Sequence, residues 1–152
     1  MSDRSAAPGK TDDKRIVNDL DIVNYWYKKS AEDDNKVALF NLGKCHELGE
    51  CENLDLAFEF YKSSANKGFI DAQYKVGYYY DHGMVVEVNK EKAFDLYEAA
   101  AKEENSDAQR SLAFLYEQGE GTKKNIENAI YWYEKAIKNG CQEAKEILNK
   151  YK

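Results

Sequence analysis

The sequence predicts an all-α fold, an α/α solenoid in which pairs of helices repeat along the chain. Three columns of alike residues support this prediction, because each column recurs at spacings of 34, 36 and 36 residues. Repetition with a period of roughly 20–50 residues is the sequence signature of solenoids. The columns are a cap column of Asp19, Asn53, Asn89 and Asn125, an aromatic column of Tyr27, Tyr61, Tyr97 and Tyr133, and an alanine column of Ala38, Ala72, Ala108 and Ala144.

The chain begins with residues 1–15, which are small and polar and show no periodic apolar positions, so we expect a disordered tail there. The solenoid is expected to fill residues 16–152, and it opens with a helix at 20–32. A last helix at 143–151 has one apolar face, which predicts that it caps the array. Three full repeats lie between these helices, at about 37–70, 71–106 and 107–142.

Each repeat begins with a first helix, in which small and apolar residues recur at helical spacing. One of them is Gly or Ala, and a glycine within a helix costs about 1 kcal/mol relative to alanine, so we expect two helices to cross closely there. A glycine follows each first helix and suits the left-handed conformation that ends many helices. The first helices are expected at 37–48, 71–82 and 107–118, the small residues are Gly43, Gly77 and Ala113, and the final glycines are Gly49, Gly83 and Gly119.

Each repeat ends with a second helix, which starts at a residue of the cap column. The Asp or Asn side chain of this column can accept backbone N–H groups at the helix start. We therefore interpret these residues as structural and not as catalytic. The tyrosines of the aromatic column are expected to find polar partners for their hydroxyl groups, as buried tyrosines generally do. The second helices are expected at 54–66, 90–103 and 126–138.

The composition excludes several classes of function. The formal net charge is −6, and basic residues alternate with acidic ones, as in Lys90-Glu91-Lys92, so we expect no nucleic-acid partner. No apolar run approaches the ~20 residues of a membrane-spanning helix. The polar N-terminus lacks the apolar core of a secretory signal. We therefore expect a cytoplasmic protein that has no membrane partner.

The cysteines and histidines do not assemble into a metal or catalytic site. Cys45, Cys51 and Cys141 are odd in number and form no disulfide framework. Cys45, His46 and Cys51 could be read as three metal ligands, but no second cluster completes a tetrahedral zinc site. His46 is expected to be a core histidine with satisfied hydrogen bonds, whereas His82 lies in a helix-ending turn. Because no nucleophile, base and metal converge, we expect no enzyme, no cofactor and no metal.

The sequence resembles Sel1-like repeats, which are helix–turn–helix relatives of tetratricopeptide repeats, over residues 19–151. The matching elements are an early Ala, a Leu-Gly pair, a Tyr and a Gly, followed by an Ala, an aromatic-Tyr pair and an Ala-Ala pair before a closing Gly. The segment Gly119-Glu120-Gly121 keeps the Gly-x-Gly turn of the family, whereas Met84-Val85-Val86 departs from it one repeat earlier. The resemblance is clearest in DAQYKVGYYYDHG…NKEKAFDLYEAAAKEE at 71–104 and DAQRSLAFLYEQGEGTKKNIENAIYWYEKAIKNG at 107–140.

The resemblance implies a right-handed superhelix of three full helix–turn–helix repeats, flanked by an N-terminal helix and a C-terminal capping helix. It also implies a scaffold or adaptor in signalling that binds a protein or peptide segment on its concave face. An alternative is a structural segment of a larger signalling protein, such as a kinase-linked array, that self-associates or stacks through its solenoid ends. The oligomeric state is then a monomer or an end-stacked dimer.

The first helices tend to line the concave side of such an array, so their residues that point away from the repeat core are candidate partner contacts. Aromatic and Arg side chains in these positions resemble interface hot spots. A second interpretation is that the aromatic residues pack between neighbouring repeats. The candidates are Phe40, Asn41, Lys44, Tyr74, Lys75, Tyr78, Arg110, Ser111 and Phe114.

Overall fold

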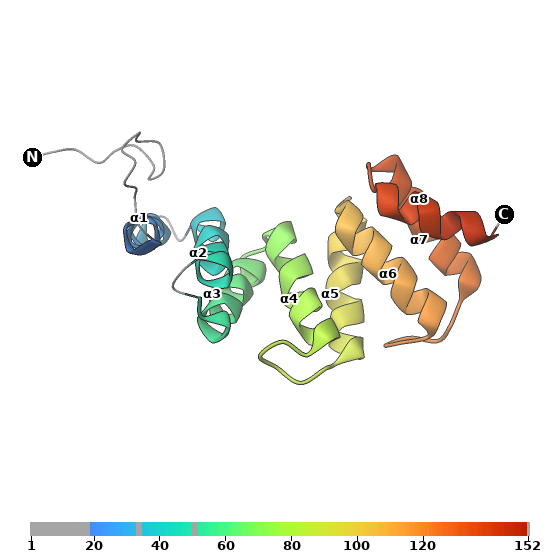
Figure 1. Ribbon diagram of the computed structural model, residues 1–152, viewed down its shortest axis with the longest axis horizontal. Helices are drawn as coiled ribbons and strands as arrows, with labels where there is room; N and C mark the ends of the chain where they lie inside the picture. The colour runs from blue at the N-terminus through green and yellow to red at the C-terminus, as the bar shows by residue number, and fades with distance from the viewer. Residues whose placement is uncertain (1–18, 33–34, 50–51, 152) are drawn as a thin grey trace, which may run out of the picture. The chain divides into compact units, whose positions relative to one another are not determined.

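The computed structural model describes residues 19–32, 35–49 and 52–151 and confirms the all-α fold for them (Figure 1). The tail predicted at 1–15 lies outside the described residues. The predicted helix bounds agree with the structure to within one residue, except that the closing helix ends in a 3₁₀ turn. The elements are α1 (Asp19–Ala31), α2 (Lys36–Leu48), α3 (Leu54–Asn66), α4 (Ile70–His82), α5 (Lys90–Lys102), α6 (Ser106–Gln118), α7 (Ile126–Lys138), α8 (Gln142–Leu148) and η1 (Asn149–Tyr151).

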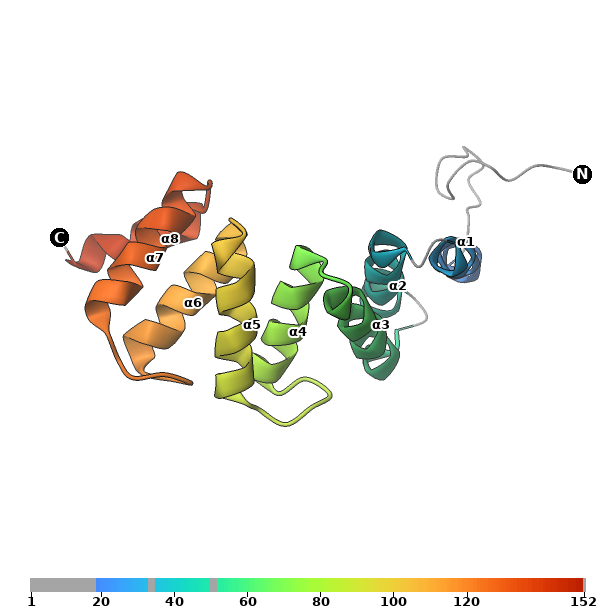
Figure 2. The same ribbon diagram turned by 180° about the vertical axis from the view of Figure 1, so that it is seen from behind.

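The chain divides into two compact units, Met1–Phe69 with α1 to α3 and Ile70–Lys152 with α4 to η1. We call them unit 1 and unit 2 and describe each by itself. In unit 1, α2 packs against both α1 and α3. In unit 2, α4 to α8 follow one another in chain order, and each helix packs against the next one (Figures 1 and 2).

Asparagine side chains start the second helices, as the cap column predicts. Each Oδ1 atom accepts the backbone N–H group three residues on, at distances of 3.1, 2.9 and 2.9 Å. These caps are Asn53, Asn89 and Asn125. Asn35 and Asn105, which belong to no column, cap the first helices α2 and α6 in the same way. Asp19 is the first residue of α1 and its side chain is not among those described, so its capping role stays a prediction.

The aromatic column forms the centre of the helix pairs. The rings of Tyr61, Tyr97 and Tyr133 are fully buried. Each hydroxyl group donates to a carboxylate of the preceding first helix, which confirms that these tyrosines find polar partners. The acceptors are Glu47, Asp81 and Glu117, with oxygen–oxygen distances of 2.7, 2.9 and 2.8 Å. Tyr27, the first member of the column, is different because 42% of it is exposed.

The small residues of the first helices lie against these tyrosine rings. A Cβ atom built on Gly43 would lie 2.6 Å from Cδ1 of Tyr61, and one built on Gly77 would lie 3.0 Å from Cδ1 of Tyr97. Both distances are shorter than ordinary van der Waals contacts, so a larger side chain would push the helix off the ring. Ala113 takes the equivalent position in α6 and is fully buried. The predicted close crossing of helices is confirmed at these positions.

The glycines that end the first helices do not all behave alike. Gly83 and Gly119 have φ angles of 67° and 72°, in the left-handed region, as predicted. Gly49 has a φ of −89°, so the prediction of a left-handed residue is wrong there. The reason is the following turn, which is two residues shorter than in the later repeats. The chain leaves α2 in an extended conformation while the Gly49 N–H group still donates to the Cys45 carbonyl at 2.9 Å.

His46 is buried, as predicted, but its hydrogen bonds are not satisfied. It is 7% exposed, and neither ring nitrogen has a hydrogen-bond partner among the described residues. Its ring stacks on that of Phe60, with centroids 5.6 Å apart. The equivalent residue of the third repeat is Tyr116, whose ring packs against Phe94. The position therefore provides aromatic contacts and no polar acceptor, which is why the prediction of a satisfied histidine is wrong.

The turn between α4 and α5 contains a strained residue. Val85 has a φ of 69° and takes the position that Gly121, with a φ of 72°, holds one repeat later. A side chain in the left-handed region costs about 1–2 kcal/mol, and β-branched residues avoid this region most strongly. Because 44% of Val85 is exposed, its packing compensates for little of this cost.

Val85→Gly is expected to raise the free energy of unfolding by about 0.5–1 kcal/mol, because the strain that it relieves exceeds the added freedom of glycine in the unfolded chain. Urea unfolding followed by circular dichroism measures the difference. Val88→Gly is the control, since Val88 is 55% exposed in the same turn and has no positive φ. This control is expected to lose stability. If Val85→Gly loses stability as well, the valine is not strained.

Candidate partner-binding surfaces

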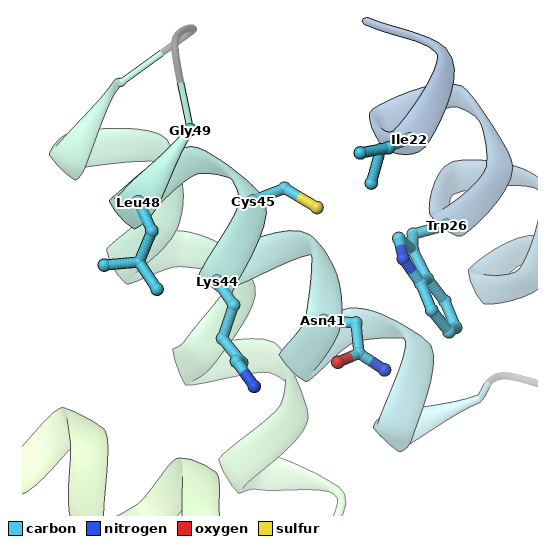
Figure 3. Close-up of a pocket in the computed structure, with 7 residues that line it drawn as sticks. All are labelled: Ile22, Trp26, Asn41, Lys44, Cys45, Leu48 and Gly49. Atoms are coloured by element: carbon cyan, nitrogen blue, oxygen red, sulfur yellow. The ribbon is translucent and has the colours of Figure 1, made fainter. Parts of the chain in front are cut away.

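In unit 1, α1 and α2 enclose an open cleft of about 280 Å³ (Figure 3). Ile22 and Trp26 of α1 face the cleft from one side, and the sulfur atom of Cys45 points toward them from α2. Asn41 and Lys44, two of the predicted site residues, also line the cleft. The structure therefore brings this pair of predicted residues into one concave feature. The remaining lining residues are Leu48 and Gly49.

The cleft combines apolar walls with polar groups on α2. Leu48 of α2 is 75% exposed and lies across the cleft from Ile22 and Trp26 of α1. Lys44 is exposed, and its ammonium group lies 5.6 Å from the centroid of the Phe40 ring. Such a cleft can hold an apolar side chain of a peptide, with an acidic group of that peptide near the lysine.

Phe40 lies next to the cleft in sequence but packs into the core of unit 1. Its half-buried ring is 5.4 Å from the Tyr61 centroid and 5.1 Å from the Phe69 centroid. At this position the second interpretation of the sequence, packing within the array, describes the contacts. A role of Phe40 in partner binding stays a prediction.

In unit 2, Arg110 and Ser111 of α6, two of the predicted residues, act on the hydroxyl group of Tyr74 of α4. Tyr74 is half buried, and its ring lies 5.6 Å from that of Tyr97. Burial raises the pKa of the Tyr74 hydroxyl and the Asp107 carboxylate adds to the increase, whereas Arg110 and Ser111 oppose it. Tyr74, Arg110 and Ser111 are therefore brought together by the fold.

Arg110 has a donor group for which the described part of the chain provides no acceptor. Its guanidinium Nη2 is 3.7 Å from Oδ1 of Asp107, an exposed residue one helical turn earlier. Its Nε atom is buried and has no hydrogen-bond partner among the described residues. A guanidinium carries five N–H donors in a planar fork that suits a carboxylate. Arg110 can therefore accept a further acidic group from a partner.

Phe114 is an exposed aromatic residue of this region, whereas Tyr78 is half buried like Tyr74. Phe114 is 47% exposed, and the half-buried ring of Tyr78 contacts that of His82 at a tilt of 48°, with centroids 4.1 Å apart. Lys75, the last predicted residue, is half buried on α4. We call Tyr78, His82, Arg110 and Phe114 the α4–α6 face.

Sequence reasoning missed several members of these surfaces, and three of them show why. Trp26 comes one residue before the aromatic column, and in α1 its side chain lines the cleft toward α2. Leu48 is the last residue of α2, where an apolar side chain carries little positional signal. His82 could have been found, because it stands four residues after Tyr78 and so shares its helix face.

Metal binding and membrane insertion find no support in the described part of the chain. Within it, no three His, Cys, Asp or Glu residues are grouped so that they could hold a metal ion. Cys51, which the zinc interpretation needs, lies outside the described residues. None of the described helices combines the length and the apolar character that a membrane crossing requires.

Comparison with known families and structures places these surfaces in a repeat protein. A family model of the Sel1 repeat matches residues 24–35, 36–69, 70–105 and 106–141. A Sel1 repeat protein from Oxalobacter formigenes has 31% sequence identity, with 88% of this chain and 99% of that chain covered and a TM-score of 0.75. No curated protein matches the chain significantly.

Two further solved structures are similar. A protective antigen of uropathogenic Escherichia coli strains that displays the SLR fold is 26% identical, covers 84% of this chain and has a TM-score of 0.78, but only 27% of that protein is matched. The cysteine rich protein B of Helicobacter pylori is 22% identical, with 86% of this chain and 95% of that chain covered and a TM-score of 0.68. This last likeness concerns the fold.

Proposed function

This chain belongs to the Sel1 repeat family, and on that premise we propose that it is a non-enzymatic scaffold that binds a peptide segment of a partner protein. Sel1 repeat proteins in general mediate protein–protein interactions. The contacts would lie on the first helices, at the α1–α2 cleft and at the α4–α6 face. On this proposal the chain acts as an adaptor in signalling.

The α4–α6 face carries the proposal. It combines Phe114, which is 47% exposed, with Tyr78 and with Arg110, whose buried Nε has no acceptor among the described residues. Aromatic and Arg side chains are enriched at interface hot spots, because each provides a large contact area with a directed polar group or π-face. A peptide with an acidic residue beside an apolar one would match both kinds of group.

The oligomeric state and compartment form part of the same proposal. We propose a monomer, because the exposed residues of α8 are polar while Ala144 and Leu148 are buried against α7. This arrangement argues against stacking through the C-terminal end, one of the ways in which the alternative function could associate. Cys141 is a free thiol, which suits the cytoplasm. The mixed surface charge supports a protein partner over nucleic acid or membrane.

Tyr78→Ala combined with Phe114→Ala is expected to weaken partner binding by roughly tenfold or more, because truncating a hot-spot aromatic costs about 2 kcal/mol. The partner is first identified by affinity capture with the wild-type chain from native cells, and the dissociation constants are then measured by calorimetry. Tyr74 is left intact in this variant, because its ring packs against Tyr97.

Tyr131→Ala is the matched control for this experiment. Tyr131 is 51% exposed on α7, in the same unit as Phe114, but it belongs to a second helix. It is expected to bind the partner as the wild type does. Equal weakening by the control and the double variant would remove the α4–α6 face from the proposal. A large loss of helical content in the double variant would show that these residues are core.

A further inference from the structure

One packing rule recurs wherever a tyrosine of the aromatic column is covered. The covering first helix places a small residue on the tyrosine ring and a carboxylate, four residues later, on the tyrosine hydroxyl. Each covered tyrosine has no exposed surface. The pairs of small and acidic residues are Gly43 with Glu47, Gly77 with Asp81, and Ala113 with Glu117.

Tyr27 of α1 is the member of the column that no described helix covers in this way. It is 42% exposed, and no described carboxylate accepts a hydrogen bond from its hydroxyl group. The opposite side of α1 is packed in the ordinary manner, since Val23 is 6% exposed and α1 packs against α2. The Tyr27 ring also touches that of Phe60, with centroids 5.4 Å apart. One side of α1 is therefore fixed in unit 1, and the side that a first helix would cover is open.

We propose that this open side of α1 is a docking site for a helix of another protein that follows the same packing rule. The partner helix would lay a Gly or Ala on the Tyr27 ring and place an Asp or Glu, four residues on, at the Tyr27 hydroxyl. The first helices of this chain also indicate which apolar residues the partner helix would carry. These share Ala, then Leu or Val four residues later, then the small residue, as in Ala38-Leu42-Gly43, Ala72-Val76-Gly77 and Ala108-Leu112-Ala113.

The chain itself does not offer a good occupant. Residues 34 positions before Ala38 and Leu42 are Arg4 and Pro8, so the N-terminal segment lacks the apolar residues that a first helix buries. The first helix without a following partner, α8, already buries Leu148 against α7 and carries Asn149 where the rule requires Gly or Ala. A helix from outside the chain is therefore favoured over residues 1–18 and over a second copy.

This site goes beyond the surfaces proposed above, because Tyr27 does not line the α1–α2 cleft and lies in a different unit from the α4–α6 face. It also gives a role to the hydroxyl group of Tyr27, a residue of the aromatic column that is 42% exposed. The chemistry of the partner follows from three occurrences of the same contact within one molecule. A peptide with the sequence of one of the chain's own first helices can therefore serve as the probe.

The test uses the full chain and a fluorescein-labelled peptide with the α6 sequence, SDAQRSLAFLYEQ, stapled between its positions 114 and 118. Both positions are exposed in the folded chain, so the staple avoids the face that covers a tyrosine. Fluorescence anisotropy is expected to show saturable binding to the wild type. Tyr27→Ala is expected to abolish it, and Tyr27→Phe, which keeps the ring and removes the donor, is expected to weaken it about tenfold.

Matched changes on both molecules separate this site from other binding. Glu117→Gln in the peptide is expected to weaken binding to the wild-type chain about as much as Tyr27→Phe in the chain weakens binding of the unchanged peptide. The two changes combined are expected to weaken binding little more than either one alone, because both remove the same hydrogen bond. Tyr131→Ala and the Tyr78→Ala, Phe114→Ala double variant are expected to bind the peptide normally. The experiments can therefore contradict the docking site on α1 without contradicting the proposed α4–α6 face, and they can contradict the α4–α6 face without contradicting the docking site.

Three results would overturn the proposal. Equal binding of the peptide by the wild type, Tyr27→Phe and Tyr27→Ala chains would show that Tyr27 is not the site. Binding that strengthens tenfold when residues 2–15 are deleted would show that the chain's own N-terminal segment is the occupant. If light scattering detects a dimer of the wild type, and Tyr27→Ala makes it a monomer, the occupant is a second copy of the chain. Circular dichroism of both Tyr27 variants verifies that their helices are intact.

Discussion

Glu117→Gln is expected to lower the free energy of unfolding by about 3 kcal/mol, one of the largest effects of a single substitution in this chain. Glu117 is 6% exposed. Its Oε1 accepts from the Tyr133 hydroxyl at 2.8 Å, and its Oε2 accepts from the Tyr151 hydroxyl at 2.6 Å and pairs with Lys150. An amide has one acceptor oxygen and no charge, so the change leaves at least one of these donors without its partner. The substitution thereby loosens the contact of α6 with both α7 and η1.

The effect of Glu117→Gln depends on pH in a defined direction. Burial by itself would raise the pKa of Glu117, but hydrogen bonds from Lys150, Tyr151 and Tyr133 outweigh it and hold the pKa below its usual range. Such a carboxylate contributes its full stabilisation above the pKa of the unfolded chain, about 4.3 for glutamate. The contribution is lost as the pH falls through the lower, folded pKa. The difference between wild type and variant is therefore expected to be constant near neutral pH and to shrink below about pH 4.

Urea unfolding at several pH values measures both the size and the pH dependence of this effect. Glu120→Gln is the control, because it removes the same charge from a residue of unit 2 whose side chain is 41% exposed and whose Oε1 is 3.4 Å from Lys90 Nζ. An exposed pair of this kind contributes about 0–1 kcal/mol. A Glu117→Gln variant that loses no more than this control would show that the buried carboxylate is not a centre of stability.

The fold could be predicted because local signals agree with one another at every repeat. The Asn89 side chain caps α5, Gly83 and Gly119 adopt the left-handed conformation, and Tyr97 is buried against a small residue. Each of these features depends on residues that are close together in the sequence, and the same residues recur every 34 or 36 positions. Consistency across levels of this kind is what lets a sequence specify one structure.

The candidate site was harder to predict, because adjacent columns of one helix face have different surroundings. Phe40 and Tyr74 share a column, and both rings lie on a tyrosine of the aromatic column, at 5.4 and 5.6 Å. Arg110 takes that position in α6 and acts electrostatically on Tyr133. Phe114, in the next column, stays 47% exposed. Helical spacing alone does not reveal which of two columns one turn apart meets a neighbouring ring.

The contacts of Glu117 could not be predicted for a related reason. The acceptor of a buried hydroxyl group was expected, but its identity depends on where two helices cross. Tyr151 lies 34 residues after Glu117 and reaches it only because the chain turns into η1 after α8. The contact between Tyr151 and Glu117 is not part of the columns that recur from repeat to repeat, so the spacing of the sequence does not predict it.

Gly121→Ala is expected to lower the free energy of unfolding by about 3 kcal/mol or more, through two separate costs. The first is conformational, since Gly121 has a φ of 72°, where alanine is disfavoured by about 1–2 kcal/mol. The second is steric, because a Cβ atom there would lie 2.2 Å from the carbonyl oxygen of Lys90. That oxygen belongs to the first residue of α5, so neither group can rotate away as a flexible side chain would. The turn after α6 must lift from the start of α5, which also separates Glu120 from Lys90.

Gly140→Ala separates these two costs, and urea unfolding of both variants gives the comparison. Gly140 has a φ of 96°, but nothing lies within 4 Å of a Cβ atom built on it, so this variant carries the conformational cost alone. We expect it to lose about 1–2 kcal/mol. The excess loss in Gly121→Ala then measures how rigidly the turn after α6 is held against α5. Equal losses in the two variants would mean that the turn moves aside freely, and that the contact between Gly121 and Lys90 does not fix adjacent repeats.

The same geometry explains why Val85→Gly is expected to raise the free energy of unfolding, whereas Gly121→Ala is expected to lower it. Val85 holds the position equivalent to Gly121, with a positive φ and a side chain already in place.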